Sequence, residues 1–173
     1  KAKACSLLLA FISSKTNAKQ KQKRNAQRPR VVLLGAGPGN PDLLTVAGLR
    51  ALQEAEVVIA DALISDKILD IARANGAELI LAKKHEDGAD PEQQRLNECG
   101  VEALKRGKRV LRLKGGDPFL FARGGEEILW YREHGFDIDV IPGVSSCFAA
   151  PASAGIPVTH RGVAEQLLIL TGK

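Results

Sequence analysis

The chain has 173 residues, of which 45% are hydrophobic and 26% are charged. These fractions are close to the average of globular proteins, so they indicate a packed core and exclude a disordered or fibrous chain. At roughly 100 to 200 residues per domain, the length predicts one domain, or one domain with a tail. Because the sequence contains no Met, we expect it to be processed or to be a fragment of a longer protein.

Positive charge is concentrated at the N-terminus. Residues 1–30 carry nine Lys or Arg and no acidic residue, whereas residues 31–173 carry a net charge of −4. Residues 15–30 are polar and without apolar periodicity, so we interpret residues 1–30 as a basic linker or arm. A targeting peptide and a segment that binds nucleic acid have similar compositions. The apolar run at 7–12 is far shorter than the roughly 20 residues that cross a bilayer, so we expect no transmembrane helix.

The three cysteines, Cys5, Cys99 and Cys147, lie far apart and show no CxxC spacing. An odd number of isolated cysteines fits neither a disulfide framework nor a zinc site, so we expect no metal centre. They are more typical of small buried residues in a reducing compartment, which predicts a cytoplasmic protein.

From residue 31 onward, strand-like apolar runs alternate with helical patterns. The first helix is predicted to start at Asn40 and Pro41, and Gly76, Gly107 and Gly135 stand where helices should end. The predicted strands are 31–35, 56–61, 77–82, 108–113, 136–143 and 166–170, and the predicted helices are 41–54, 65–74, 91–106, 124–134 and 145–154. This alternation predicts an α/β fold with an open, mostly parallel, twisted sheet and helices on both faces.

The first strand leads into a glycine-rich turn, residues 35–42, and then into a helix. Glycines at such a turn let a ligand approach the backbone, and a helix N-terminus favours an anion. Together with Asp61 at the end of the second strand, the turn imitates a dinucleotide-binding fingerprint. The third glycine of that fingerprint would fall at position 40, which is Asn, so NAD or FAD binding is disfavoured.

A second glycine cluster follows the fourth strand, in the sequence RLKGGDPFLFARGGEE at 112–127. Ligands of open parallel sheets bind beyond the carboxyl ends of the strands, so we expect this loop, the first turn and Asp61 to meet at one crevice. In the alternative interpretation, these glycines only form turns, and Glu126 and Glu127 only favour a helix N-terminus.

A third segment, 142–146, has small residues where a strand enters a helix, and 154–161 follows that helix. The small residues leave room for a flat ligand group, although they are equally suited to tight helix packing. A single His160 is more typical of a surface residue than of a catalyst.

In order and separation, these segments resemble the tetrapyrrole methylase family, and within it the members that act on uroporphyrinogen III. The motifs are VVLLGAGPGNPDLLT at 31–45, RLKGGDPFLFARGGEE at 112–127, PGVSS at 142–146 and AGIPVTHR at 154–161. The resemblance implies transfer of methyl groups from S-adenosylmethionine to carbons 2 and 7 of uroporphyrinogen III, which yields precorrin-2 and S-adenosylhomocysteine. Complete members continue into a second α/β domain, so residues 31–173 would be the N-terminal domain alone.

The resemblance also implies roles for individual residues. Asp61 matches the family's proton acceptor and Lys83 its proton donor. The residues that would bind the cofactor are Pro38, Gly115, Gly116, Asp117, Leu120, Ser145 and Ser146. The substrate carries eight carboxylates, for which cations at the mouth of the site would be supplied by Lys83, Lys84, Arg112, Lys114, Arg123, His160 and Arg161.

Some positions depart from the family pattern. Asn40 replaces an acid, Ala62 stands where many members have Arg, and residues 85–95 do not match the usual loop. Precorrin methylases, ribosomal RNA methylases and diphthine synthase are alternatives within the family, and a nucleic-acid-binding module that uses the basic arm is an alternative outside it. The favoured interpretation implies a homodimer when complete, with no nucleic-acid or membrane partner.

Overall fold

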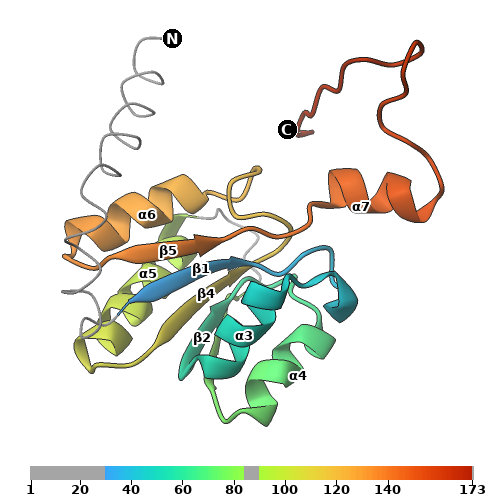
Figure 1. Ribbon diagram of the computed structural model, residues 1–173. Coiled ribbons are helices and arrows are strands. Elements are labelled where there is room, and N and C mark those ends of the chain that lie inside the picture. Colours follow the sequence, from blue (N-terminus) through green and yellow to red (C-terminus); the bar gives the residue numbers. More distant parts are fainter. Residues whose placement is uncertain (1–29, 84–89, 173) are drawn as a thin grey trace, which may run out of the picture.

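The computed structural model describes residues 30–83 and 90–172. Five strands form one sheet in the order β3-β2-β4-β1-β5 (Figure 1). Their bounds are Val31–Gly35 for β1, Val57–Ala60 for β2, Glu78–Leu81 for β3, Val110–Lys114 for β4 and Ile138–Ile141 for β5. Every pairing between these strands is parallel, which confirms the predicted open sheet. All five strands therefore end at the same edge.

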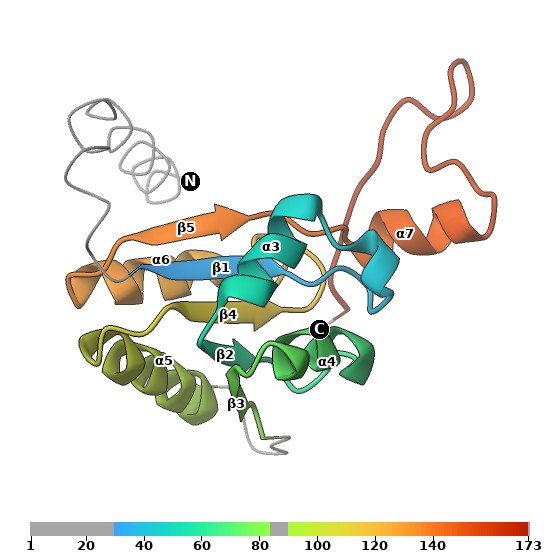
Figure 2. The same cartoon turned by 60° about the horizontal axis from the view of Figure 1, so that its bottom comes forward.

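Helices cover both faces of this sheet, as predicted (Figures 1 and 2). Helices α3 (Val46–Glu54) and α4 (Asp66–Ala74) pack on one face, and α5 (Asp90–Lys105) and α6 (Gly124–Glu133) on the other. Because side chains alternate along a strand, Leu111 and Leu113 of β4 enter the α3–α4 core, while Val110 enters the α5–α6 core. None of the helices within the described residues is both long and apolar enough to span a membrane.

The predicted helix 41–54 is divided in two, which corrects the sequence prediction. A 3-10 turn, η2 (Pro41–Leu43), comes first, and its start is capped by Asn40, whose Oδ1 accepts a hydrogen bond of 3.1 Å from the amide of Asp42. Thr45 then caps α3 by accepting 3.0 Å from the amide of Gly48. The extended backbone that Thr45 needs as a cap separates the two pieces.

The predicted helix stops are confirmed. Gly76, Gly107 and Gly135 follow the ends of α4, α5 and α6 and have φ values of 76°, 77° and 83°. This left-handed conformation ends a helix at little steric cost only when the residue is glycine.

The sixth strand predicted at 166–170 is wrong, because this segment has no regular structure. The chain leaves β5 through α7 (Ser146–Ser153), which has no buried residue and extends beyond the carboxyl edge of the sheet (Figure 1). The following segment therefore does not reach an edge strand with which it could pair. Its Leu168 and Leu170 are 78% and 77% exposed.

Some of the predictions made from the sequence lie outside the described residues. These are residues 1–29 of the basic arm predicted at 1–30, together with Cys5 and Lys84. The other two cysteines, Cys99 and Cys147, are free thiols and only partly buried, so the expectation that they are buried holds only in part.

Candidate functional site

The loops that follow β1, β4 and β5 touch one another through their backbones. Gly37 and Gly116 exchange two hydrogen bonds, of 3.2 and 2.9 Å. A Cβ atom on Gly143 would lie only 2.2 Å from the carbonyl oxygen of Gly116, and one on Gly35 would lie 2.6 Å from the amide nitrogen of Gly143. Only glycine permits this approach, so the glycine clusters bring the loops after β1 and β4 together as predicted. The loop after β5, for which the sequence left two interpretations open, joins them.

We expect Gly143→Ala to destabilise the protein by about 1–3 kcal/mol, because the added methyl group clashes with backbone atoms that cannot rotate away. Urea unfolding of the variant and the wild type measures the difference. The matched control is Gly125→Ala, because a Cβ atom on Gly125 meets nothing within 4 Å and Gly125 lies in α6. Equal stabilities of Gly143→Ala and the wild type would contradict this reading of the loop contact.

The carboxylate of Asp117 joins two of these loops. Its Oδ1 accepts 2.9 Å from the amide of Phe119, and its Oδ2 accepts 3.2 Å from the amide of Gly143. Each carboxylate oxygen retains a second acceptor position, so a ligand can still be bound there. Asp117 therefore fixes the loops, and its predicted contact with a cofactor stays a prediction.

The loop after β4 is strained as well as glycine-rich. Phe121 and Arg123 have φ values of 54° and 59°, although neither is glycine. Such conformations cost of order 1–3 kcal/mol each and are concentrated at ligand-binding sites. Arg123 also binds Glu126 through two contacts of 2.9 and 2.6 Å, so its guanidinium is held beside the loop.

The residues predicted to bind a cofactor lie on these same loops. A side chain at Gly115 would enter open space, since no other atom lies within 4 Å of the place that a Cβ would take. A Cβ on Gly116 would lie 3.9 Å from the Cα of Ser145. We call the three loops in contact, with the main chain at Gly115 open on the side of its missing side chain, the backbone cradle, and this opening suits a ligand that approaches the main chain closely. Pro38 and Ser146 are exposed, and Leu120 is partly buried.

The two predicted catalytic residues lie at the same edge of the sheet. Asp61 follows β2 and is partly buried, whereas Lys83 follows the neighbouring strand β3 and is exposed. The amide of Lys83 donates 2.7 Å to Oε1 of Glu92, which is also bound by Arg95 at 2.6 Å. Helix α5 therefore anchors the backbone at Lys83.

The structure corrects the predicted location of Arg112 and Lys114. Neither residue lies at the mouth of the site. Arg112 is 0% exposed and Lys114 is 2% exposed, because positions 112 and 114 of β4 point toward α5 and α6. Arg112 Nε donates 2.7 Å to Oε1 of Glu127, and its Nη2 binds Oδ1 of Asp61. Lys114 Nζ lies 3.1 Å from Oε1 of Glu127 and 3.4 Å from Oδ2 of Asp61.

Glu127 was missed as a functional residue, because the sequence suggested only a favourable helix start. The structure buries it completely, and its Oε1 also accepts 2.7 Å from Nε2 of Gln93. The sequence did contain a signal for a buried carboxylate: two cations stand at alternate positions of a central strand, and buried cations require buried carboxylates as partners.

The pKa values of this cluster reflect its burial and its charges. Burial acts to lower the pKa of Arg112, but the charges of Glu127 and Asp61 outweigh it and raise that pKa. Burial also raises the pKa of the neighbouring Tyr131, which keeps that hydroxyl neutral.

His160 and Arg161 are not brought to the glycine loops. Both are exposed on a turn closed by a 2.9 Å bond from the amide of His160 to the carbonyl of Ala164. The segment that carries them follows α7 and extends away from the sheet (Figure 1). Their predicted contact with the substrate stays a prediction.

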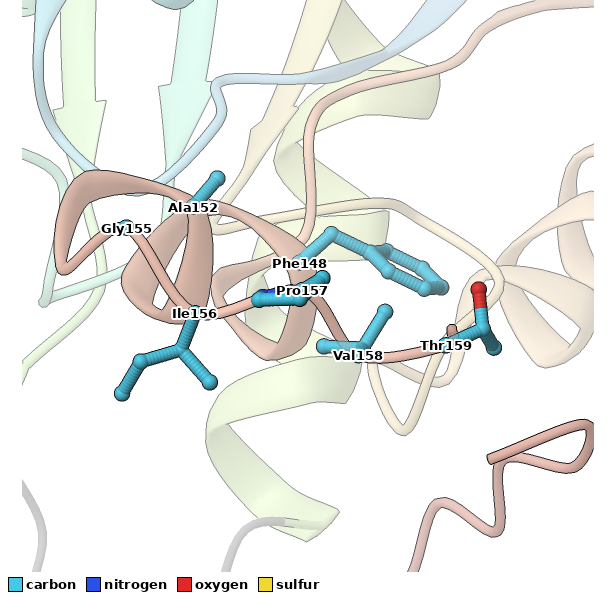
Figure 3. Close-up of a pocket in the computed structure, with 7 residues that line it drawn as sticks. All are labelled: Phe148, Ala152, Gly155, Ile156, Pro157, Val158 and Thr159. Carbon is cyan, nitrogen blue, oxygen red and sulfur yellow. The ribbon is translucent and has the colours of Figure 1, made fainter. Parts of the chain in front are cut away.

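A shallow apolar groove lies on this C-terminal segment (Figure 3). Its volume is about 430 Å³, and it is lined by Phe148, Ala152, Gly155, Ile156, Pro157, Val158 and Thr159. None of these residues belongs to the glycine loops, so the groove is separate from the candidate site. Within the described ranges, no group of three or more His, Cys, Asp or Glu is placed to hold a metal ion.

An open parallel sheet with glycine loops and charged side chains at its carboxyl edge defines a doubly wound α/β ligand-binding domain. Residues 30–173 match the model of the family Tetrapyrrole (Corrin/Porphyrin) Methylases. The chain belongs to this family, which confirms the resemblance seen in the sequence.

Individual relatives agree with this membership. The chain is 50% identical over 143 residues to a uroporphyrinogen-III C-methyltransferase of Methanocaldococcus jannaschii, covering 83% of this chain and 59% of that protein. It is 48% identical over 146 residues to a probable uroporphyrinogen-III C-methyltransferase of Schizosaccharomyces pombe, covering 84% of this chain and 29% of that protein. The chain thus spans between 29% and 59% of the length of these curated relatives.

Solved structures show the same fold. A uroporphyrin-III C-methyltransferase from Thermus thermophilus superposes with a TM-score of 0.68 at 41% identity, covering 78% of this chain and 56% of that one. A structure of the Thermus thermophilus enzyme complexed with S-adenyl homocysteine superposes with a TM-score of 0.65 at 39% identity, covering 79% of this chain and 53% of that one.

Proposed function

We propose that the protein carrying this chain is an S-adenosylmethionine-dependent methyltransferase that acts on uroporphyrinogen III at carbons 2 and 7 and yields precorrin-2. The observation that carries the proposal is the backbone cradle formed by the three glycine loops at the carboxyl edge, next to Asp61. Two relatives, one named uroporphyrinogen-III C-methyltransferase at 50% identity and one named a probable such enzyme at 48%, support the substrate class. The relative solved with S-adenyl homocysteine supports the cofactor.

The glycine loops are suited to hold the cofactor, which supplies an electrophilic methyl group when bound. The open space beside Gly115 admits a ligand close to the main chain, and the φ of 61° at Gly116 turns the loop around it. Asp117 keeps two of the loops together. Pro38, Leu120, Ser145 and Ser146 complete the proposed set of cofactor contacts.

Asp61 and Lys83 are suited to handle protons. Methylation of a pyrrole carbon creates a cation that must lose a proton, so a base is required beside the ring. The carboxylate of Asp61, with 33% of its side chain exposed at the strand end, serves as this base and takes the proton that each methyl transfer releases. Any proton that Lys83 donates to the ring must be matched by a second proton lost from it, and the role of Lys83 as a donor stays a prediction. Lys83 and Arg123, which lie at the carboxyl edge and are exposed or partly exposed, pair with the substrate carboxylates, whereas Arg112 and Lys114 are too deeply buried to do so. For His160 and Arg161, which lie away from the glycine loops, only the resemblance supports a contact with the substrate.

The proposed function is tested on the full-length protein that contains this chain. It is incubated with uroporphyrinogen III and S-adenosylmethionine labelled in its methyl group, and the products are analysed by mass spectrometry. We expect a doubly methylated product that carries the label. Labelling of a precorrin but not of uroporphyrinogen III would favour another member of the family and would overturn the proposed substrate.

In the same protein, Asp117→Ala should weaken the binding of S-adenosylhomocysteine by about 1.5–3 kcal/mol, the value typical of hydrogen bonds to a charged group. The variant loses both a potential ligand contact and the link between two loops. Isothermal titration calorimetry measures the affinity, with Asp70→Ala on the exposed face of α4 as the control. Unchanged affinity of Asp117→Ala would show that the cofactor does not depend on this carboxylate.

A further inference from the structure

Four charged side chains form a cluster under the candidate site, which we call the charge quartet. Its members are Asp61, Arg112, Lys114 and Glu127. The two cations lie on the face of β4 that otherwise packs against apolar residues of α5 and α6. Taking an ion out of water costs several kcal/mol, so such a cluster is a poor device for stability alone. Its charges balance, with two cations and two carboxylates.

Exposure is graded within the charge quartet. The side chains of Arg112 and Glu127 are 0% exposed and that of Lys114 is 3% exposed, whereas that of Asp61 is 33% exposed. The only member that presents a substantial surface to solvent is therefore the carboxylate at the end of β2. A reactant at the carboxyl edge can reach Asp61 but not the three groups behind it.

The buried members hold both oxygens of this carboxylate. Arg112 binds Oδ1 of Asp61, and Lys114 lies 3.4 Å from Oδ2. Rotation of the carboxylate breaks at least one of these contacts. The backbone of Asp61 is fixed as well, because its amide donates 3.1 Å to the carbonyl of Leu113.

The guanidinium of Arg112 is itself immobile. Its Nη1 donates 3.2 Å to each of the carbonyls of Ile59 and Leu113, and its Nε donates 2.7 Å to Glu127. Its contacts thus extend over strands β2 and β4 and helix α6. Movement of Arg112 toward a substrate would leave Glu127 partly unpaired in the core, at a cost of several kcal/mol.

We propose that Arg112 is a positioning residue, which together with Lys114 and Glu127 fixes the carboxylate of Asp61 for proton transfer. The proposal rests on the proposed function, in which Asp61 accepts the proton. It replaces the expectation that Arg112 binds the carboxylates of the substrate. Arg112 acts through Asp61 and touches neither substrate nor cofactor.

The first test is Arg112→Lys in the full-length protein, because lysine keeps the charge but lacks the planar fork that reaches Asp61 and Glu127 together. We expect kcat to fall about 10- to 100-fold, the typical loss for a misplaced catalytic group, with KM for uroporphyrinogen III and Kd for S-adenosylhomocysteine unchanged. The matched control is Arg109→Lys, which should behave as the wild type. Arg109 is exposed and directly precedes the first residue of β4, at the end of the strand away from the candidate site. A raised KM with unchanged kcat would overturn the proposal and restore Arg112 as a substrate ligand.

The double variant Arg112→Met/Glu127→Met covers the case in which Arg112→Lys does not fold. It removes one cation and one carboxylate, so Lys114 and Asp61 remain as a balanced pair, and such replacements are often neutral or stabilising. We expect a thermal midpoint near that of the wild type but a kcat as low as that of Arg112→Lys. A kcat equal to that of the wild type would overturn the proposal.

A second measurement does not depend on activity. Urea unfolding of the 173-residue chain is compared for the wild type, for the single variants Asp61→Asn and Arg112→Met, and for the variant that combines these two substitutions. We expect Asp61→Asn to lower the midpoint less in the Arg112→Met background than in the wild type, because the two side chains interact directly. Additive effects would overturn the positioning role. Non-additive effects in a protein that does not methylate uroporphyrinogen III would support the coupling and contradict only the proposed function.

Discussion

Glu127→Ala should lower the free energy of unfolding by about 3–5 kcal/mol, the loss typical when one partner of a buried ion pair is removed. Glu127 accepts hydrogen bonds from Arg112 at 2.7 Å and from Lys114 at 3.1 Å, and its side chain is wholly buried. Alanine leaves two buried cations with only Asp61 as a counterion. Stability typical of a small domain is 5–15 kcal/mol, so the variant should be only marginally folded.

The matched control for this prediction is the adjacent residue. Glu126 has a side chain that is 61% exposed and pairs with Arg123 at the surface, so Glu126→Ala should cost no more than about 1 kcal/mol. Urea unfolding followed by circular dichroism measures both variants. Similar losses for the two would mean that Glu127 contributes through the helix terminus that both share and that its burial among cations is unimportant.

The parts of the fold that the sequence predicted correctly depend on local signals. The alternation of apolar runs and helical patterns located five strands, and glycine located the ends of three helices. The prediction at 166–170 was wrong because an apolar run becomes a strand only where another strand is available for pairing. The single helix predicted over 41–54 was wrong because two competing caps, Asn40 and Thr45, follow each other within half a dozen residues or so.

The candidate site was predictable to a different extent. The glycine clusters indicated which loops meet, because close backbone contact permits no other residue. The sequence did not show where Arg112 and Lys114 point, since a cation in a motif looks the same whether it faces a ligand or the core. Alternation along β4 places both on the α5–α6 face, but only the buried position of Glu127 explains how that face accommodates them.

In the full-length protein, Asp61→Asn should reduce kcat for uroporphyrinogen III by about 10²- to 10⁴-fold, the usual contribution of a positioned general base. Asparagine is nearly the same size and its oxygen can still accept a hydrogen bond from Arg112, but the amide does not accept the proton that leaves the ring. The substitution also removes one of the two negative charges of the charge quartet.

Two controls separate this chemical effect from a structural one. Asp66→Asn changes an exposed acid at the start of α4, whose side chain is 86% exposed, and should leave kcat unchanged. The affinity of Asp61→Asn for S-adenosylhomocysteine should equal that of the wild type, because the glycine loops that form the cradle are unaltered. If Asp61→Asn retained kcat within about threefold, a factor worth less than 1 kcal/mol of barrier, the proton would have to leave through another group and Asp61 would not be the base.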